Sequence, residues 1–264
     1  MTFDALARHI LVPDAEPACR RELERLAAAD LRRAWIAASL KTPARIPARP
    51  LAPAAVLKLA ALVSGRPATL KALVATGGKR SLGGAPSGTA LKNLARAKRM
   101  LRRVWPEQAA QTSWYLRRIV FVGKGGFEGT IPELPGFSFF RSAESWSGGK
   151  VGVVSSEAFE FLLHESAHQQ LLLLGRAFPL WESEYRTRFV SPWSGETRKA
   201  IALPAALHAY WITLEGLRRA GGADSRVAAL RRGFAPGFAL ARRHMKLTDH
   251  GRRFLELLEA KVGR

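Results

Sequence analysis

The chain has little cysteine, few acidic residues for its many basic ones, and no long apolar run. Only one of its 264 residues, Cys19, is a cysteine, which excludes an intrachain disulfide and a cysteine-rich zinc framework and agrees with a reducing cytoplasm. The apolar runs are too short to span a bilayer, and the residues after Met1 lack the basic and apolar regions of a secretory signal. We therefore expect a cytoplasmic protein with no membrane association.

Acidic residues are half as numerous as basic ones. The chain has 21 Asp and Glu against 42 Lys and Arg, a formal net charge of +21, and such a charge attracts anionic partners. The segment Lys92–Arg103 would form a basic helix face suited to nucleic acid, but no helix-turn-helix, zinc finger or aromatic RNA-binding motif accompanies it. A solvated basic surface, or a surface for an acidic peptide, is therefore favoured over a nucleic-acid surface.

The most informative feature present is the H-E-x-x-H motif formed by His164, Glu165 and His168. It lies in the apolar stretch 156–174, which has no Gly or Pro and therefore predicts a buried helix. Histidines four residues apart share one helix face and can reach one divalent ion, while Glu165 is placed to handle a proton on a metal-bound water. Because buried His and Glu side chains need a compensating partner, a metal site is favoured over histidines satisfied within the core.

A third ligand has to come from elsewhere in the chain. The metzincin extension is missing, because Leu171 and Leu174 stand where its glycine and third histidine would be. His208, in an apolar helical segment, is the better candidate, and the alternative for it is a core histidine bonded to a backbone carbonyl. Glu215, two turns further along that helix, is another ligand candidate or a residue that orients the ligands. Glu160, on the motif helix, is a further candidate for orienting them.

The pattern of residues predicts an α+β, predominantly helical fold. Residues 1–112 form an N-terminal helical region, a candidate peptide-binding subdomain, which the Pro-rich linker Thr42–Pro50 and the Gly-rich loop Thr76–Gly84 interrupt. Residues 113–264 form the metal-binding catalytic domain. In it a small antiparallel sheet packs against the motif helix.

Within the second region, short β-branched and aromatic runs predict strands, and apolar residues at helical spacing predict helices. The predicted strands are Arg118–Val122, Gly136–Phe140 and Lys150–Val154, and the helices after the motif are Ala205–Ala220, Ser225–Lys246 and Thr248–Lys261. Pro236 is expected to kink the second of these helices, and Thr248 to cap the third.

Four segments together resemble a family of H-E-x-x-H peptide-modification proteins that occur with ribosomal peptide natural-product clusters. They are Leu163–Gln169, Ser191–Arg198, Leu207–Ala209 and Leu247–Gly251. The resemblance covers roughly residues 115–262. It implies a bacterial enzyme that depends on iron(II) and 2-oxoglutarate and hydroxylates a side chain of a precursor peptide, which the basic surface suggests is acidic.

The resemblance also implies roles for individual residues. His164, His168 and His208 would be iron ligands, and Arg198 would hold a carboxylate of 2-oxoglutarate. The proline that usually precedes this arginine is Thr197 here.

Two other classes of function stay open. In a zinc metallopeptidase, Glu165 would be the general base, and Tyr210 or His250 would stabilise the oxyanion. The third class is a nonenzymatic protein that binds nucleic acid or a leader peptide and has a vestigial metal site.

Overall fold

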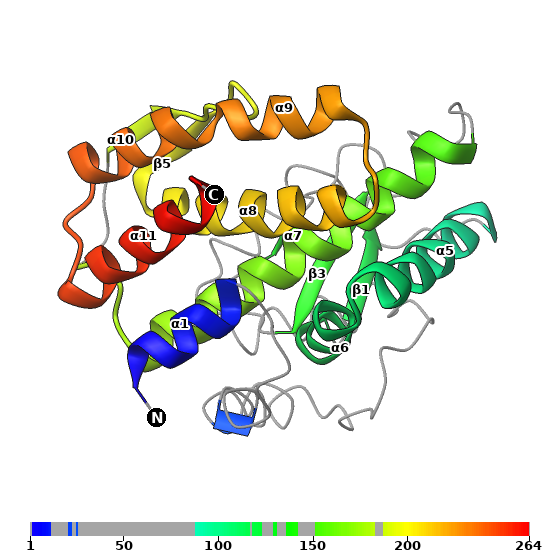
Figure 1. Cartoon of the computed structure of the whole chain (residues 1–264), viewed down its shortest axis with the longest axis horizontal. Helices are drawn as coiled ribbons and strands as arrows, with labels where there is room; N and C mark the ends of the chain where they lie inside the picture. The colour runs from blue at the N-terminus through cyan, green and yellow to red at the C-terminus, as the bar shows by residue number, and fades with distance from the viewer. Residues whose placement is uncertain are drawn as a thin grey trace. The chain divides into compact units, whose positions relative to one another are not determined.

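The structure is a computed structural model, and it is mostly helical (Figure 1). It describes residues 2–11, 21–22, 25, 88–116, 118–122, 129–130, 136–141, 151–182 and 187–263. The predicted linker Thr42–Pro50 and the predicted loop Thr76–Gly84 lie outside these residues. None of the helices in the described ranges combines the length and the apolar run that crossing a membrane requires.

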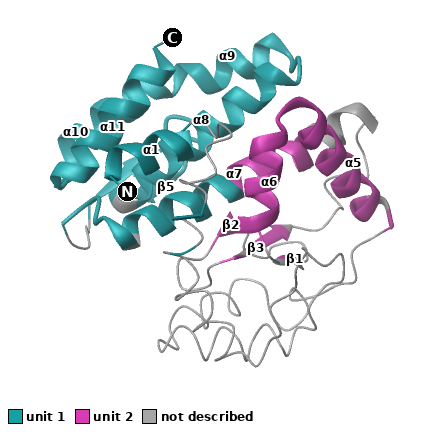
Figure 2. Cartoon of the chain, turned by 60° about the horizontal axis from the view of Figure 1, so that its bottom comes forward, with its two compact units in different colours: residues 1–26, 166–264 teal, residues 27–165 magenta. Residues whose placement is uncertain are grey.

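The chain divides into two compact units (Figure 2). Unit 1 contains residues 1–26 and 166–264, and unit 2 contains residues 27–165. The first helix, α1 (Phe3–Leu11), packs against helices from the C-terminal part of the chain, and the boundary at residue 112 stays a prediction. The peptide-binding role given to residues 1–112 stays a prediction.

Before the start of α7 (Val151–Ala177), the described residues of unit 2 form two helices and a three-stranded sheet. The helices are α5 (Gly88–Val104) and α6 (Pro106–Tyr115), and the strands are β1 (Arg118–Val122), β2 (Gly129–Thr130) and β3 (Phe137–Arg141). The order is β1-β3-β2, with β1 parallel and β2 antiparallel to β3. The sheet is thus mixed, whereas the sequence predicted an antiparallel one. β2 lies between β1 and β3 in sequence but pairs at the outer edge of β3, so β1 and β3 are direct neighbours and run parallel.

The sheet packs against the motif helix, as predicted. This helix, α7, runs from Val151 to Ala177, and the rings of Phe140 on β3 and Phe161 on α7 lie 4.2 Å apart between centroids. The predicted strand Lys150–Val154 is wrong, because residues from Val151 onward form the first turns of α7. β-Branched residues disfavour a helix only weakly, so the long helical segment that follows them decides their conformation.

In the described residues of unit 1, α1 and the second part of α7 are joined by a hairpin, a short 3-10 helix and four further α-helices. They are β4 (Arg188–Val190), β5 (Thr197–Lys199), a short 3-10 helix (Ala200–Ala202), α8 (Leu203–Arg219), α9 (Asp224–Arg232), α10 (Phe234–His244) and α11 (Asp249–Val262). Thr248 caps α11 as predicted, because its hydroxyl accepts a hydrogen bond from Gly251 N at 3.1 Å.

The predicted helix Ser225–Lys246 is two helices that meet at Gly233. A Cβ atom at this glycine would lie 2.2 Å from the indole Nε1 of Trp193, which donates to Leu230 O at 2.9 Å. The Trp193 ring occupies the corner between α9 and α10. Pro236 lies in the first turn of α10, where a proline costs little, so the break precedes the expected kink.

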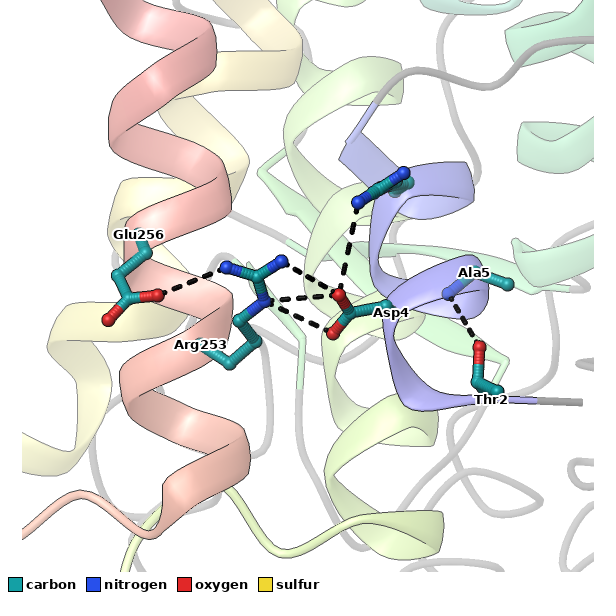
Figure 3. Close-up of polar contacts among 6 residues, drawn as sticks. Thr2, Asp4, Ala5, Arg253 and Glu256 are labelled. Carbon is teal, nitrogen blue, oxygen red and sulfur yellow. Dashed lines mark hydrogen bonds and ion pairs between the residues drawn. The ribbon is translucent and has the colours of Figure 1, made fainter.

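The N-terminal helix α1 is tied to α11 and α8. The guanidinium of Arg253 on α11 donates to both carboxylate oxygens of Asp4 and also to Glu256 (Figure 3). At the other end of α1, the indole of Trp211 donates to the carbonyl of Leu11 at 2.7 Å. A C-terminal carbonyl of a helix lacks a partner within that helix, and a side chain from α8 supplies one here.

Candidate metal centre

The motif residues form one group on α7. His164, Glu165 and His168 each offer a ligand atom, and these atoms all lie within 4.8 Å of one another. Glu165 is buried, at 5% exposure, and both histidines are half-buried. Because residues one turn apart project from the same side of a helix, the predicted convergence of the two histidines is confirmed.

The sheet holds the carboxylate of Glu165. Thr130 on β2 donates its hydroxyl hydrogen to Glu165 Oε2 at 2.6 Å, and the Thr130 and Ser138 hydroxyl oxygens lie 2.9 Å apart. Thr130 and Ser138 face each other in the β2–β3 register. Since a hydroxyl has one hydrogen and an ionised carboxylate only accepts, Ser138 is the donor to Thr130, and the chain of hydrogen bonds ends at Glu165.

Sequence reasoning missed Thr130 and Ser138. The available signal was Ser138 itself, a polar residue within the aromatic run Phe137–Arg141. It is fully buried, and a buried hydroxyl needs a hydrogen-bonding partner.

The three donors fit a divalent transition metal. Zn²⁺ and Fe²⁺ both accept imidazole and carboxylate ligands. Bonds of about 2.0–2.2 Å put two donors on one ion about 3–4 Å apart. Donor atoms that all lie within 4.8 Å need only small side-chain rotations to reach that geometry, so the group is a candidate metal site.

His208 does not join this group. The ring is fully buried; its Nδ1 lies 3.0 Å from the carbonyl oxygen of Ala167 and its Nε2 lies 3.0 Å from that of Ile10. Burial lowers the pKa of His208 to about 4, although the two carbonyls oppose this shift. The ring is therefore neutral at pH 7 and donates through one nitrogen only. A carbonyl oxygen faces each ring nitrogen, which is the arrangement of a core histidine; the role of His208 as third ligand stays a prediction.

The other predicted residues on α8 are engaged within unit 1. Glu215 accepts hydrogen bonds from Arg218 and Arg219 at 3.4 and 2.8 Å. The ring of Tyr210 stacks on Trp193 with 4.6 Å between centroids. Neither residue belongs to the candidate metal group among the described side chains.

The remaining candidates lie at the surface or beside the motif. Arg198, on β5, is exposed and pairs with Glu196. His250 packs against the Phe3 ring at 4.7 Å between centroids. Glu160 is half-buried on α7. Burial of Glu157 raises the pKa of that residue, and the negative charge of Glu160 raises it further. The orienting role predicted for Glu160 stays a prediction.

Comparison with known proteins adds no assignment. No protein-family model matches the chain, and no curated protein matches it. The group on α7 is the feature that indicates metal binding.

Proposed function

We propose that the protein is a metal-dependent enzyme that modifies a peptide, by iron(II)- and 2-oxoglutarate-dependent hydroxylation of a side chain in a ribosomally made precursor. The observation that carries the proposal is the group of His164, Glu165 and His168, whose ligand atoms lie within 4.8 Å of one another. Two imidazoles and one carboxylate are the donor set of non-haem iron(II) oxygenases. The oxoacid and the peptide come from the sequence resemblance.

The proposed ligand set differs from the one implied by the resemblance. Glu165 replaces His208 as the third ligand, because backbone carbonyls face both nitrogens of His208. Arg198 keeps its proposed role with the far carboxylate of 2-oxoglutarate, since an arginine binds a carboxylate through two hydrogen bonds. The oxoacid would then displace Glu196, with which Arg198 pairs.

The residues around the metal would position it and control one carboxylate. When bound, iron(II) would supply the redox chemistry that no side chain here provides. Thr130 fixes the orientation of Glu165 through the 2.6 Å hydrogen bond, and a hydrogen bond donated to a carboxylate favours its ionised form. Thr130 would thereby orient Glu165 toward the metal.

A zinc metallopeptidase is the second candidate, and the same hydrogen bond favours it. An ionised carboxylate fixed beside two histidines can accept a proton from a nucleophilic water. In this alternative only His164 and His168 of the group bind the metal, and Glu165 is a base. The two candidates therefore differ in the role of Glu165.

Reconstitution without oxygen separates the candidates. Iron(II) and 2-oxoglutarate should together give a weak visible charge-transfer band in the wild-type protein. His164→Ala and His168→Ala should lose the band and the bound metal, whereas His244→Ala, a histidine outside the group, should keep both.

Three results would contradict the preferred proposal. Absence of the band together with zinc-supported peptide cleavage would identify the peptidase. Cleavage lost in Glu165→Gln with zinc still bound would identify Glu165 as its base. The metal site would have no role in function if both histidine variants bound nucleic acid or a leader peptide as the wild type does and the wild type showed no turnover.

A further inference from the structure

Helix α5 carries positive charge along one face and apolar residues along the opposite one. Lys92, Arg96, Arg99 and Arg103 are all exposed, and their spacing of four, three and four residues puts them in one row. We name this row the basic stripe. The opposite face is buried and consists of Ala90, Leu94, Ala97 and Leu101, so the helix is fixed with the stripe outward.

Nothing acidic on α5 offsets this charge. The helix has no Asp or Glu in its sequence, and within the described ranges the basic stripe forms no ion pair. Lys98, beside the stripe, is partly buried; burial and then the charge of Arg102 lower its pKa. Uncompensated like charges crowded on one helix cost stability, and an anionic partner would relieve this cost.

We propose that the basic stripe binds an acidic segment of the peptide that the enzyme modifies. The stripe extends over about 16 Å, at about 1.5 Å per helical residue, which is the length of about five residues of extended peptide. Side chains on one side of an extended peptide recur every 6–7 Å or so. The basic residues recur every 4.5–6 Å or so along α5, so flexible Arg side chains can meet alternate Asp or Glu residues.

An extended peptide suits this surface better than a nucleic acid does. The basic stripe supplies four exposed cationic side chains. A protein that binds a duplex contacts about 6–10 phosphates and commonly draws its cations from several elements. A single short row instead fits a short linear anion. The proposal rests on the proposed function for the identity of the peptide, but binding to the stripe requires neither metal nor turnover.

Fluorescence anisotropy with the full-length protein tests the surface directly. The probe is a labelled peptide of alternating Glu and Ser, with a Gln-Ser peptide as the uncharged control. Arg96→Gln/Arg99→Gln should weaken binding of the acidic peptide about five- to tenfold at low salt, the sum of two exposed ion pairs. Glutamine keeps the helix propensity of arginine, so equal circular dichroism melting curves should show that the fold is retained.

The matched control removes the same charge elsewhere. Arg231→Gln/Arg232→Gln changes two exposed arginines on α9 and should alter affinity less than about twofold. Equal losses in the two double variants would overturn the proposal, because net charge alone would then explain binding. It would also be overturned if single-stranded oligothymidylate of equal charge bound more tightly than the peptide and lost its binding in the α5 variant. Loss of peptide binding with unchanged metal reconstitution would support the stripe whatever reaction the enzyme performs.

Discussion

Replacing His208 by glutamine should remove a large part of the acid sensitivity of this fold. Burial lowers the pKa of His208 from 6.5 to about 4. Below about pH 6.5 the unfolded chain therefore takes up a proton that the folded chain does not, and folded stability falls until the pH reaches about 4. At 1.36 kcal/mol per pKa unit, the whole effect is about 3 kcal/mol. The contribution of His208 to the free energy of unfolding is complete above about pH 6.5 and is lost as the pH falls toward about 4.

The measurement is the free energy of unfolding in urea, with a chelator present, at about pH 7 and about pH 4.5. The wild type should lose about 2–3 kcal/mol more than His208→Gln between these two conditions. The amide of glutamine can still donate to a carbonyl but does not titrate, so the variant isolates the proton. Asp4, whose pKa is lowered chiefly by its hydrogen bond to Arg253, contributes equally to both proteins. Equal losses in the two proteins would refute a neutral, buried His208.

Two further substitutions, one of them with a matched control, test the packing of α11 and the hydrogen bond to Glu165. Gly251→Ala would place a Cβ atom 1.8 Å from the carbonyl oxygen of Leu180 and should lower the free energy of unfolding in urea by about 2–4 kcal/mol. The control Gly175→Ala, whose Cβ atom would have its nearest contact at 3.8 Å, should stabilise α7 by up to about 1 kcal/mol. Similar urea midpoints for the two variants would contradict the close approach of Gly251 to Leu180. Thr130→Val removes a hydrogen bond to the carboxylate of Glu165 that is worth about 1.5–3 kcal/mol, so the affinity for Fe²⁺ at pH 7, in which Glu165 is the proposed third ligand, should fall about tenfold. An unchanged Fe²⁺ affinity would mean that Thr130 does not position Glu165 as a ligand.

The parts of the fold that depend on short-range patterns could be predicted from the sequence. Thr248 caps α11 through a bond to the backbone three residues on, and His164 and His168 converge because of helix geometry alone. The segment Val151–Val154 was mispredicted for the opposite reason. Its β-branched residues favour a strand locally, but the helix to which they are joined determines their conformation.

The parts of the site that depend on distant contacts could not be predicted. Thr130 reaches Glu165 across 35 positions, and His208 reaches Ile10 across 198. An apolar helix with one histidine looks the same in sequence whether the ring binds a metal or a carbonyl. The position of α1 decides between these two roles, because Ile10 of α1 supplies one of the carbonyls. The residues around His208 in the sequence do not specify where α1 lies.

The attachment of α1 to α11 constrains the order of folding. Asp4 and Arg253 are 249 positions apart, so their contact cannot form until residue 253 has left the ribosome. Until then Phe3, Leu6 and Ile10, which end up buried, have no α11 to cover them. Contacts between such distant residues form slowly, and apolar surface exposed during this wait invites aggregation. Recovery of the protein should therefore depend on chaperones more than its final stability suggests.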